Sequence, residues 1–196
     1  MKNVRKYIIG IDEVGRGPLA GPVAVGAMLV TTRMRSLFRH IKESKQLSEK
    51  QREEWYERIK KDSGPELRFA VSFVSAKMID AKGISHAIRL AINRSLKKLA
   101  VDPDECTVLL DGGLRAPEEY RDQQTIIRGD AGETAIAMAS VVAKVERDRM
   151  MVRLGKKFPQ YGFAEHKGYG TQSHVDMIRR YGISASHRKS FCRRFT

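Results

Sequence analysis

The chain has 196 residues, of which 37 are lysine or arginine and 23 are aspartate or glutamate, so its formal net charge is +14. That length suits a single domain, and a hydrophobic fraction of 41% is enough for a proper core. So large a positive charge is typical of proteins that bind phosphate polymers or anionic lipid surfaces.

Several features argue against the lipid alternative. The longest apolar run, at 19–30, has twelve residues including glycine and proline, which is too short to cross a bilayer. No signal peptide is expected, because the N-terminal stretch reaches carboxylates after a very short apolar run. Cys106 and Cys192 lack metal-like spacing and fit a reduced cytoplasmic protein better than a disulfide scaffold. The sequence therefore predicts a cytoplasmic protein without a membrane partner.

The first half of the chain is expected to contain three strands and two helices. Apolar runs and alternation predict the strands at 6–13, 20–31 and 66–74. Ser48 and Gln51 form a capping box that opens a helix reaching about Lys61. A second helix is predicted over 85–100, because apolar side chains share one face at helical spacing: Ile88, Ala91, Ile92, Leu96 and Leu99.

The second half alternates strands with helices. Two further strands are predicted, at 107–111 and 123–130. A long helix over 133–157 follows, and its many small residues permit close packing on a sheet. A glycine- and tyrosine-rich loop, a last helix at about 172–181 and a basic tail complete the chain. This order indicates an α/β layered domain with a central mixed β-sheet flanked by helices.

Four acidic residues lie on the predicted strands or at their ends. Asp12 and Glu13 lie on the first strand, Asp111 ends the fourth, and Asp130 ends the fifth. Strand ends are where α/β folds collect ligand-binding groups. Converging carboxylates repel one another and lose hydration unless a cation lies among them, and Mg²⁺ or Mn²⁺ prefers such oxygen ligands.

Spacing alone leaves a structural alternative open for these acids. Asp111 is followed by two glycines, and aspartate before glycine is common in ordinary turns. Asp12 and Glu13 are adjacent and so point to opposite faces of an ideal strand. Both could serve one metal cluster only if one of them reached around the strand end. The pattern is therefore compatible with a metal-dependent phosphoryl-transfer site and with turn or capping roles.

The motifs, taken together and in order, resemble those of bacterial ribonuclease HII. They are GIDEVGRGPLAGPV, ESKQLSEKQRE, LLDGG, RGDA followed by IAMASVVAKVERDR, FPQYGFAEHKGYGT and HRKSF. The resemblance runs from about residue 8 to 191, which is nearly the whole chain. GIDEVGRG combined with the later pair of ASVVAKVERDR and HKGYGT is highly specific.

The resemblance implies an RNase H-like fold in one domain over 1–196, with a C-terminal helical segment at about 158–196 that contacts substrate. It implies a monomeric endonuclease that uses two divalent ions, Mn²⁺ or Mg²⁺. Such an enzyme would cut the RNA strand of RNA/DNA hybrids and incise 5′ of single ribonucleotides in duplex DNA, leaving 5′-phosphate and 3′-hydroxyl ends. By motif match, the catalytic metal-binding acids are Asp12, Glu13, Asp111 and Asp130.

The same resemblance assigns residues that read the sugars. Gly15-Arg16-Gly17 resembles the loop that recognises the ribose 2′-hydroxyl through backbone groups. Tyr169 resembles the tyrosine that packs on the deoxyribose after the ribonucleotide, and Tyr161 is a second candidate for that role.

Basic and histidine side chains supply further candidates. Phosphate contacts are expected from four cations: Lys45, Lys144, Lys167 and Arg188. Lys144 and Arg147 are three positions apart on one helix and could share a face. The irregular spacing of the last three histidines favours structural or phosphate roles over a metal site: His166, His174 and His187.

Two departures from the family pattern bear on substrate positioning. Glu43 stands where the family usually has aspartate before Ser44 and Lys45, and the segment AGETAI after Asp130 is unusual.

Two alternative functions remain open on the sequence. Ribonuclease HIII carries an additional N-terminal substrate-binding domain, for which the early first strand is expected to leave no room. A non-catalytic nucleic-acid-binding protein would use the basic surface alone.

Overall fold

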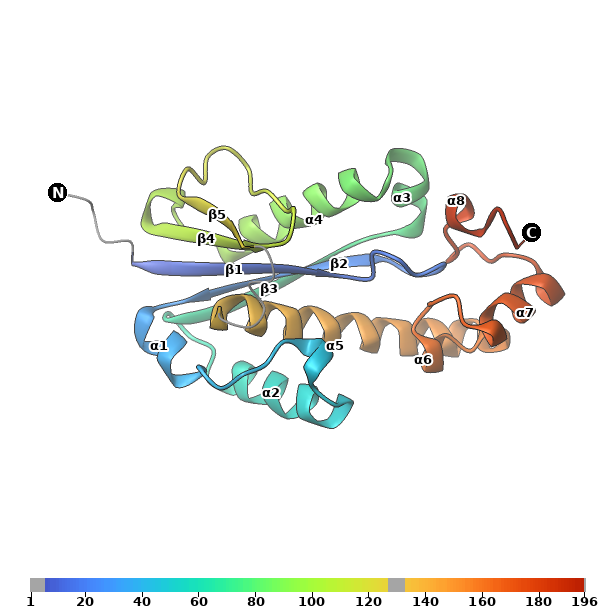
Figure 1. Cartoon of the computed structure of the whole chain (residues 1–196), viewed down its shortest axis with the longest axis horizontal. Helices are drawn as coiled ribbons and strands as arrows, with labels where there is room; N and C mark the ends of the chain where they lie inside the picture. The colour runs from blue at the N-terminus through green and yellow to red at the C-terminus, as the bar shows by residue number, and fades with distance from the viewer. Residues whose placement is uncertain (1–5, 127–132, 196) are drawn as a thin grey trace.

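A five-stranded mixed sheet, in the order β3-β2-β1-β4-β5, forms the centre of the molecule (Figure 1). The computed structural model describes residues 6–126 and 133–195. β1 pairs antiparallel with β2 and parallel with β4, and β2 also pairs antiparallel with β3, so β2 runs opposite to the other four strands. The strands are β1 (Tyr7–Val14), β2 (Val23–Val30), β3 (Leu67–Val74), β4 (Cys106–Asp111) and β5 (Gln123–Ile126).

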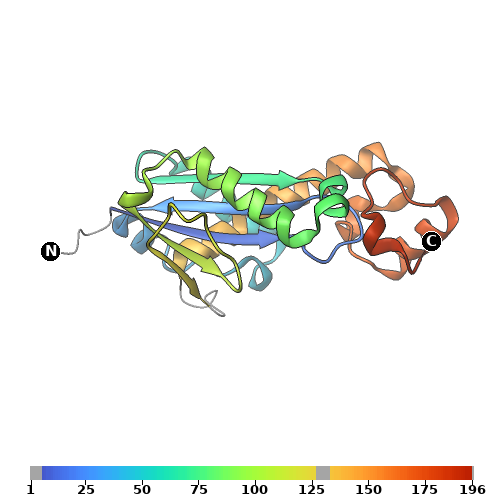
Figure 2. The same ribbon diagram turned by 90° about the horizontal axis from the view of Figure 1, so that it is seen from above.

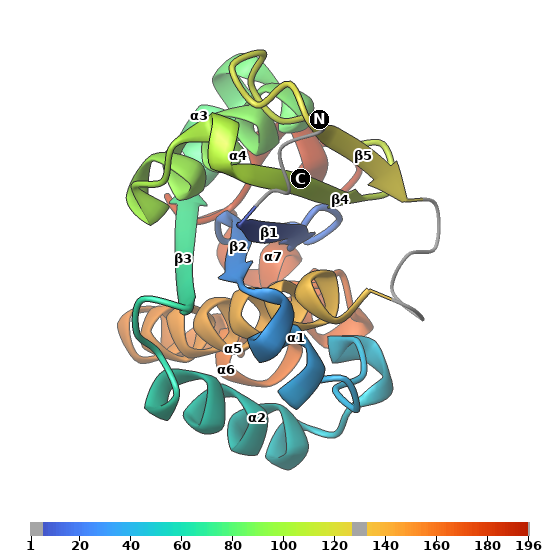
Figure 3. The same cartoon turned by 90° about the vertical axis from the view of Figure 1, so that its left-hand side faces the viewer.

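Helices cover both faces of this sheet and one of its ends. α3 and α4 lie on one face, and α5 lies on the other with α1 and α2 outside it (Figure 3). α6, α7 and α8 gather beyond the end of the sheet that is opposite the N-terminus (Figure 2). The helices are α1 (Thr32–Leu37), α2 (Glu49–Lys61), α3 (Ala76–Lys82), α4 (Ile84–Leu99), α5 (Thr134–Lys157), α6 (Phe163–His166), α7 (Gln172–Tyr181) and α8 (Lys189–Cys192).

The side chains of β1 separate into two sets, one for each face of the sheet. Ile9 and Ile11 enter the core under α4, whereas Ile8 packs in the core under α5. The alternation follows from the two-residue period of a strand. Asp12, two positions after Gly10, therefore faces α5.

α5 lies unusually close to β1 and β2, because glycine occupies the strand positions beneath it. A Cβ atom built on Gly10 would lie 2.1 Å from the carbonyl carbon of Ala135, and one on Gly26 would lie 2.4 Å from the carbonyl oxygen of Ala139. No side chain larger than hydrogen fits at either position. The predicted close packing of the small-residue helix on the sheet is confirmed.

Most predicted elements are confirmed, including the capping box at Ser48 and Gln51. The second strand was predicted to begin at residue 20 but begins at Val23. The reason is that Gly21 has φ +84° and Ala20 forms a bridge with His187 instead. The predicted fifth strand extends to Asp130, and its part beyond Ile126 lies outside the described residues.

The sequence analysis did not predict α1, α3, α6 or α8, each of which has seven residues or fewer. Helices this short show too few turns for a periodic pattern. Among the described residues, no helix combines the length and the apolar character that a bilayer crossing requires.

We expect Gly10→Ala to lower the free energy of unfolding by about 3 kcal/mol, because the added methyl group would force α5 away from the sheet. Chemical denaturation measures this loss. Gly64→Ala is the matched control, since a Cβ atom there would meet nothing within 4 Å. Equal stability of the two variants would contradict the proposed close packing.

Candidate active site

Two of the four predicted acids, Asp12 and Asp111, lie side by side near the C-terminal ends of adjacent strands. This part of the sheet is the acidic edge. β1 and β4 are parallel, and Ile11 pairs with Leu110. The next residues along the two strands are Asp12 and Asp111, which therefore occupy equivalent positions on the face toward α5. The expectation that distant acids meet at this edge of the sheet is met for this pair.

The carboxyl group of Asp12 is buried beside two other carboxyl groups, and this environment raises its pKa. Burial raises its pKa to about 7, and the nearby charge of Glu13 and then that of Asp111 contribute to the rise. A hydrogen bond from Ser140 and one of 2.7 Å from the Glu13 N–H act in the opposite direction. A divalent cation would balance the negative charge that these neighbouring carboxyl groups place around Asp12.

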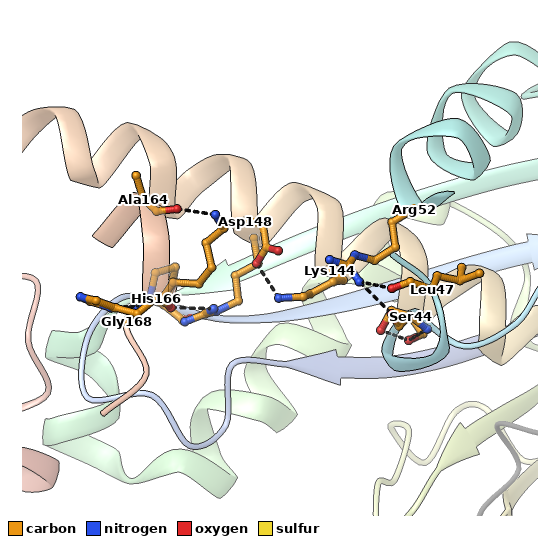
Figure 4. Close-up of polar contacts among 12 residues, drawn as sticks. Ser44, Leu47, Arg52, Lys144, Asp148, Ala164, His166 and Gly168 are labelled. Carbon is orange, nitrogen blue, oxygen red and sulfur yellow. Dashed lines mark hydrogen bonds and ion pairs between the residues drawn. The ribbon is translucent and has the colours of Figure 1, made fainter. Parts of the chain in front are cut away.

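Ser140 on α5 is part of this site, and sequence reasoning missed it. Its hydroxyl lies 2.7 Å from the Ser44 hydroxyl and accepts a hydrogen bond of 3.1 Å from the Ser44 N–H. These contacts hold Ser44, and with it the segment that carries exposed Lys45, against α5; Figure 4 labels Ser44 at this contact. The available signal was a polar residue within the small-residue face of a helix that packs on a sheet.

The other two predicted acids differ from this pair. Glu13 follows Asp12 and points away from α5, as a strand requires, and its carboxylate accepts a 3.2 Å hydrogen bond from Arg16. Asp130 lies outside the described residues. Within residues 6–126 and 133–195, no three His, Cys, Asp or Glu side chains are grouped so that they could hold a metal ion.

The loop from Gly15 to Gly21, the glycine loop, packs against two buried arginines. Gly15 has φ +85°, and a Cβ atom there would lie 2.1 Å from Nε of Arg147, so only glycine fits. Arg188 donates from Nη2 to the Gly15 carbonyl at 2.6 Å and from Nη1 to the Arg16 carbonyl at 2.9 Å. Its Nε donates to the Gly21 carbonyl at 3.0 Å. The loop is therefore held from beneath by one side chain.

These contacts correct the prediction for Arg188. It was expected to contact phosphate, but its side chain is fully buried, with 0% exposure, and three loop carbonyls occupy its donors. Burial, and then the charge of Arg147, lower its pKa to about 10, so it remains a cation near neutral pH. Arg188 supports the loop rather than facing a phosphate.

The suggestion that Lys144 and Arg147 share an exposed face is wrong. Arg147 is fully buried and donates to the carbonyls of Pro22 and Lys167, at 3.0 and 3.1 Å. Lys144 stays near the surface and pairs with Asp148 on the same helix at 2.8 Å (Figure 4). Only Lys144 remains placed to approach a phosphate.

Lys167 is half-buried and lies in the loop between α6 and α7. Its ammonium group donates to the Ala164 carbonyl, and its own carbonyl accepts from Arg147. The backbone of this residue has φ +52°, which is uncommon for a side chain larger than glycine. Its hydrogen bonds thus tie this loop to α6 and α5.

The two tyrosine candidates have opposite environments. Tyr161 is 3% exposed, stacks on Phe163 and donates its hydroxyl to the Gly182 carbonyl, so it cannot face a substrate. Tyr169 is 42% exposed, and the Arg147 guanidinium lies 5.9 Å from the centre of its ring. Of the two, only Tyr169 has a ring face available to a ligand.

A relay of two neutral histidines holds the backbone of Tyr169. The Ser184 N–H donates to Nδ1 of His187 at 2.9 Å, so that His187 carries its proton on Nε2. This Nε2–H faces Nε2 of His174 at 3.1 Å, and Nδ1–H of His174 donates to the Tyr169 carbonyl at 2.8 Å. The two bonds in which a ring nitrogen accepts, at Nδ1 of His187 and at Nε2 of His174, require neutral rings, and these contacts fit a structural role for the pair.

His166 stacks on His174 with ring centres 4.3 Å apart and completes this cluster. The Gly168 N–H donates to its Nδ1 at 3.1 Å, and its Nε2 contacts the Tyr161 carbonyl at 2.6 Å. The structural role expected for the histidines fits these contacts, and their ring nitrogens are already occupied.

The histidine relay predicts an acid-sensitive stability. Burial lowers the pKa of His174 and of His187 from 6.5 to about 4. The unfolded chain therefore binds protons first, and the stability that the neutral pair contributes is complete above pH 6.5 and is lost as pH falls toward 4. We expect chemical denaturation to show a loss of about 4 kcal/mol between pH 7 and pH 5 from this pair, about 2 kcal/mol for each histidine.

The matched comparison is between His187→Gln and His86→Gln, because His86 is exposed on α4. His187→Gln should reduce the dependence of stability on pH, and His86→Gln should leave it unchanged. The same pH dependence in both variants would exclude the relay as its source.

Comparison with known proteins supports one family. The family model described as Ribonuclease HII matches residues 9–195. Ribonuclease HII of Caldicellulosiruptor bescii is 39% identical over 186 residues, which cover 95% of this chain and 86% of the relative.

Solved structures show the same fold. The structure of the PCNA:RNase HII complex from Archaeoglobus fulgidus contains a chain that superposes with a TM-score of 0.75, at 26% identity, covering 93% of both chains. Bst-RNase HIII in complex with Mn²⁺ superposes with a TM-score of 0.68 at 20% identity, covering 92% of this chain and 64% of that one.

The fold is thus the RNase H-like one that the resemblance implied. The match of the family model over nearly the whole chain agrees with the motifs at the acidic edge and the glycine loop. The chain belongs to the ribonuclease HII family and is an RNase H-type endonuclease.

Proposed function

We propose that this protein cuts the RNA strand of RNA/DNA hybrids and incises 5′ of single ribonucleotides in duplex DNA, with two divalent ions as cofactors. Asp12, Glu13, Asp111 and Asp130 would hold the ions, which are Mg²⁺ or Mn²⁺. When bound, such ions activate a water molecule and stabilise the charge that develops on the phosphate and on the leaving 3′-oxygen. The products would carry 5′-phosphate and 3′-hydroxyl ends.

The observation that carries this proposal is the pairing of Asp12 with Asp111. Two carboxyl groups meet at the ends of adjacent strands, and the pKa of one of them rises to about 7. The Ser140 hydroxyl group also interacts with the Asp12 carboxyl group and favours its ionised form, which is the form that binds a metal ion. Oxygen ligands of this kind suit the hard ions Mg²⁺ and Mn²⁺. A protein that bound nucleic acid by its basic surface alone would gain nothing from this acidic pair.

The glycine loop supports recognition of ribose. A Cβ atom on Gly17 would meet nothing within 4 Å, so no contact inside the protein requires glycine at this exposed position. Glycine does permit a ligand to approach the backbone closely. A 2′-hydroxyl both donates and accepts hydrogen bonds, and backbone groups can read it without regard to the base. That independence from sequence suits an enzyme that removes ribonucleotides wherever they occur in DNA.

Surface cations would hold the rest of the duplex. The formal charge of +14 provides attraction to a phosphate backbone, and the acids at the strand ends cannot supply it. Lys45 is exposed beside the Asp12 site, and Lys144 is 20% exposed. Lys167 would have to leave the Ala164 carbonyl to contact a phosphate. The segment at about 158–196 would contribute Tyr169 to this surface.

We also propose that the enzyme acts as a monomer in the cytoplasm. Neither cysteine forms a disulfide bond in the described structure, and both thiols are buried in separate apolar clusters. Such cysteines suit a reducing compartment.

We expect Asp12→Asn to reduce incision of a duplex with one embedded ribonucleotide to the background without enzyme, while binding of the duplex survives. The loss follows because an amide oxygen is a weaker ligand for a dication than a carboxylate. The incision assay with Mg²⁺, Mn²⁺ or chelator measures it, and the position of the cut distinguishes incision 5′ of the ribonucleotide from other modes. Undiminished cleavage by Asp12→Asn, or full activity in chelator, would refute the metal site.

We expect Tyr169→Ala to lower kcat/KM on the single-ribonucleotide duplex by about tenfold, and to lower it less on a long hybrid, because the ring would pack on the sugar at the RNA–DNA junction. Tyr169→Phe keeps the ring and should keep the activity. Equal losses on both substrates would argue against reading of the junction.

A further inference from the structure

We propose that Arg188 is the positioning residue that gives the glycine loop its preference for ribose, by turning two backbone N–H groups toward the substrate. This inference rests on the proposed function, because it concerns how the same loop recognises the 2′-hydroxyl. It assigns Arg188 a role in specificity although the side chain never touches the nucleic acid.

The geometry begins with the two carbonyl groups that Arg188 binds. Its Nη2 holds the Gly15 carbonyl at 2.6 Å, and its Nη1 holds the Arg16 carbonyl at 2.9 Å. Both carbonyls therefore point inward, toward a guanidinium that is 0% exposed. The planar fork of a guanidinium fixes the directions of several acceptors at once.

The inward carbonyls determine where the amide protons point. The described chain contains no cis peptide bond, and in a trans peptide the C=O and the N–H point in opposite directions. An inward Gly15 carbonyl therefore directs the Arg16 N–H outward, and an inward Arg16 carbonyl directs the Gly17 N–H outward. Among the described residues, neither of these two N–H groups has a hydrogen-bond acceptor. Successive outward N–H groups form a receptor for an oxygen atom.

Arg188 itself is held so that its side chain cannot turn away. Its backbone N–H donates to the Leu19 carbonyl at 2.8 Å, and the Gly21 N–H donates to the Ser186 carbonyl at the same distance. Next to it, His187 forms a bridge with Ala20. The segment that carries Arg188 therefore runs along the glycine loop and is bonded to it on both sides.

The same segment also supports the second element that would read a sugar. His187 precedes Arg188 in the chain and connects through His174 to the Tyr169 carbonyl. The loop that carries Tyr169 is also bonded to the glycine loop, because the Leu19 N–H donates to the Gly168 carbonyl at 2.8 Å. Positioning of the loop and of the tyrosine thus depends on two adjacent residues.

The test compares the affinity for a duplex with one ribonucleotide with the affinity for the same duplex made only of DNA. Both are measured in the Asp12→Asn background with Mg²⁺, so that no cleavage occurs. Arg188→Lys keeps the charge but cannot hold three carbonyls, so we expect the ratio of the two Kd values to fall by about tenfold toward unity. Affinity for the all-DNA duplex should change little. An unchanged ratio would overturn the inference.

Two comparisons separate the possible failures. If Asp12→Asn alone shows no preference for the ribonucleotide, the proposed function fails before Arg188 is tested. Leu96→Ala, which truncates a buried core side chain on α4, controls for lost stability and should keep the ratio. A ratio that falls equally in Leu96→Ala and Arg188→Lys would show that general destabilisation, and not loop geometry, is responsible.

Two further measurements cover the case in which Arg188→Lys does not fold. Guanidinium ions added to Arg188→Ala should restore the ratio, because they can occupy the vacated position between the carbonyls. In the Asp12→Asn protein, the ¹⁵N resonances of the Arg188 side chain should shift on binding the ribonucleotide duplex and not on binding the all-DNA duplex. Absence of that difference would count against the inference.

Discussion

The close packing of α5 against β1 and β2 is the constraint on which the acidic edge depends. Gly10 and Gly26 remove the side chains that would otherwise separate the helix from the sheet. The helix backbone then approaches the strands closely enough for Ser140 to reach Asp12. Without this approach, Asp12 would lose both its hydrogen bond and the burial that raises its pKa. The β1–β4 register thus places the two carboxyl groups together, and the helix–sheet packing buries Asp12.

Charges of opposite sign are separated within a short region of the fold. Carboxyl groups gather at the ends of β1 and β4, whereas the guanidinium groups of Arg147 and Arg188 lie beneath the neighbouring loop. Neither arginine forms an ion pair in the described part of the chain, and backbone carbonyls satisfy most of their donors instead. Buried cations that are satisfied by carbonyls retain their full charge and can attract a phosphate backbone without contacting it.

The sequence predicted the sheet and the long helices well, because each of those elements repeats its apolar pattern over several turns or residue pairs. It also predicted that Asp12, on one buried strand, and Asp111, at the end of another, would converge, although spacing alone left turn or capping roles open. It could not show that Arg188 points inward or that Ser140 contacts Asp12, because both facts depend on contacts between segments far apart in the chain. Arginine on a basic tail has the same sequence signature whether it is exposed or buried. The sequence also could not show that the second strand begins at Val23, because the bridge between Ala20 and His187 is a contact between distant segments.

The hydrogen bond between Arg188 and Gly15 joins residues that are 173 positions apart. A contact of such long range costs loop-closure entropy, which the surrounding packing must offset. Local fraying of the C-terminal helices would therefore release the glycine loop while both apolar cores stay intact. The ribose preference that we propose for this loop should thus be lost under mild heat or limited proteolysis before the sheet unfolds.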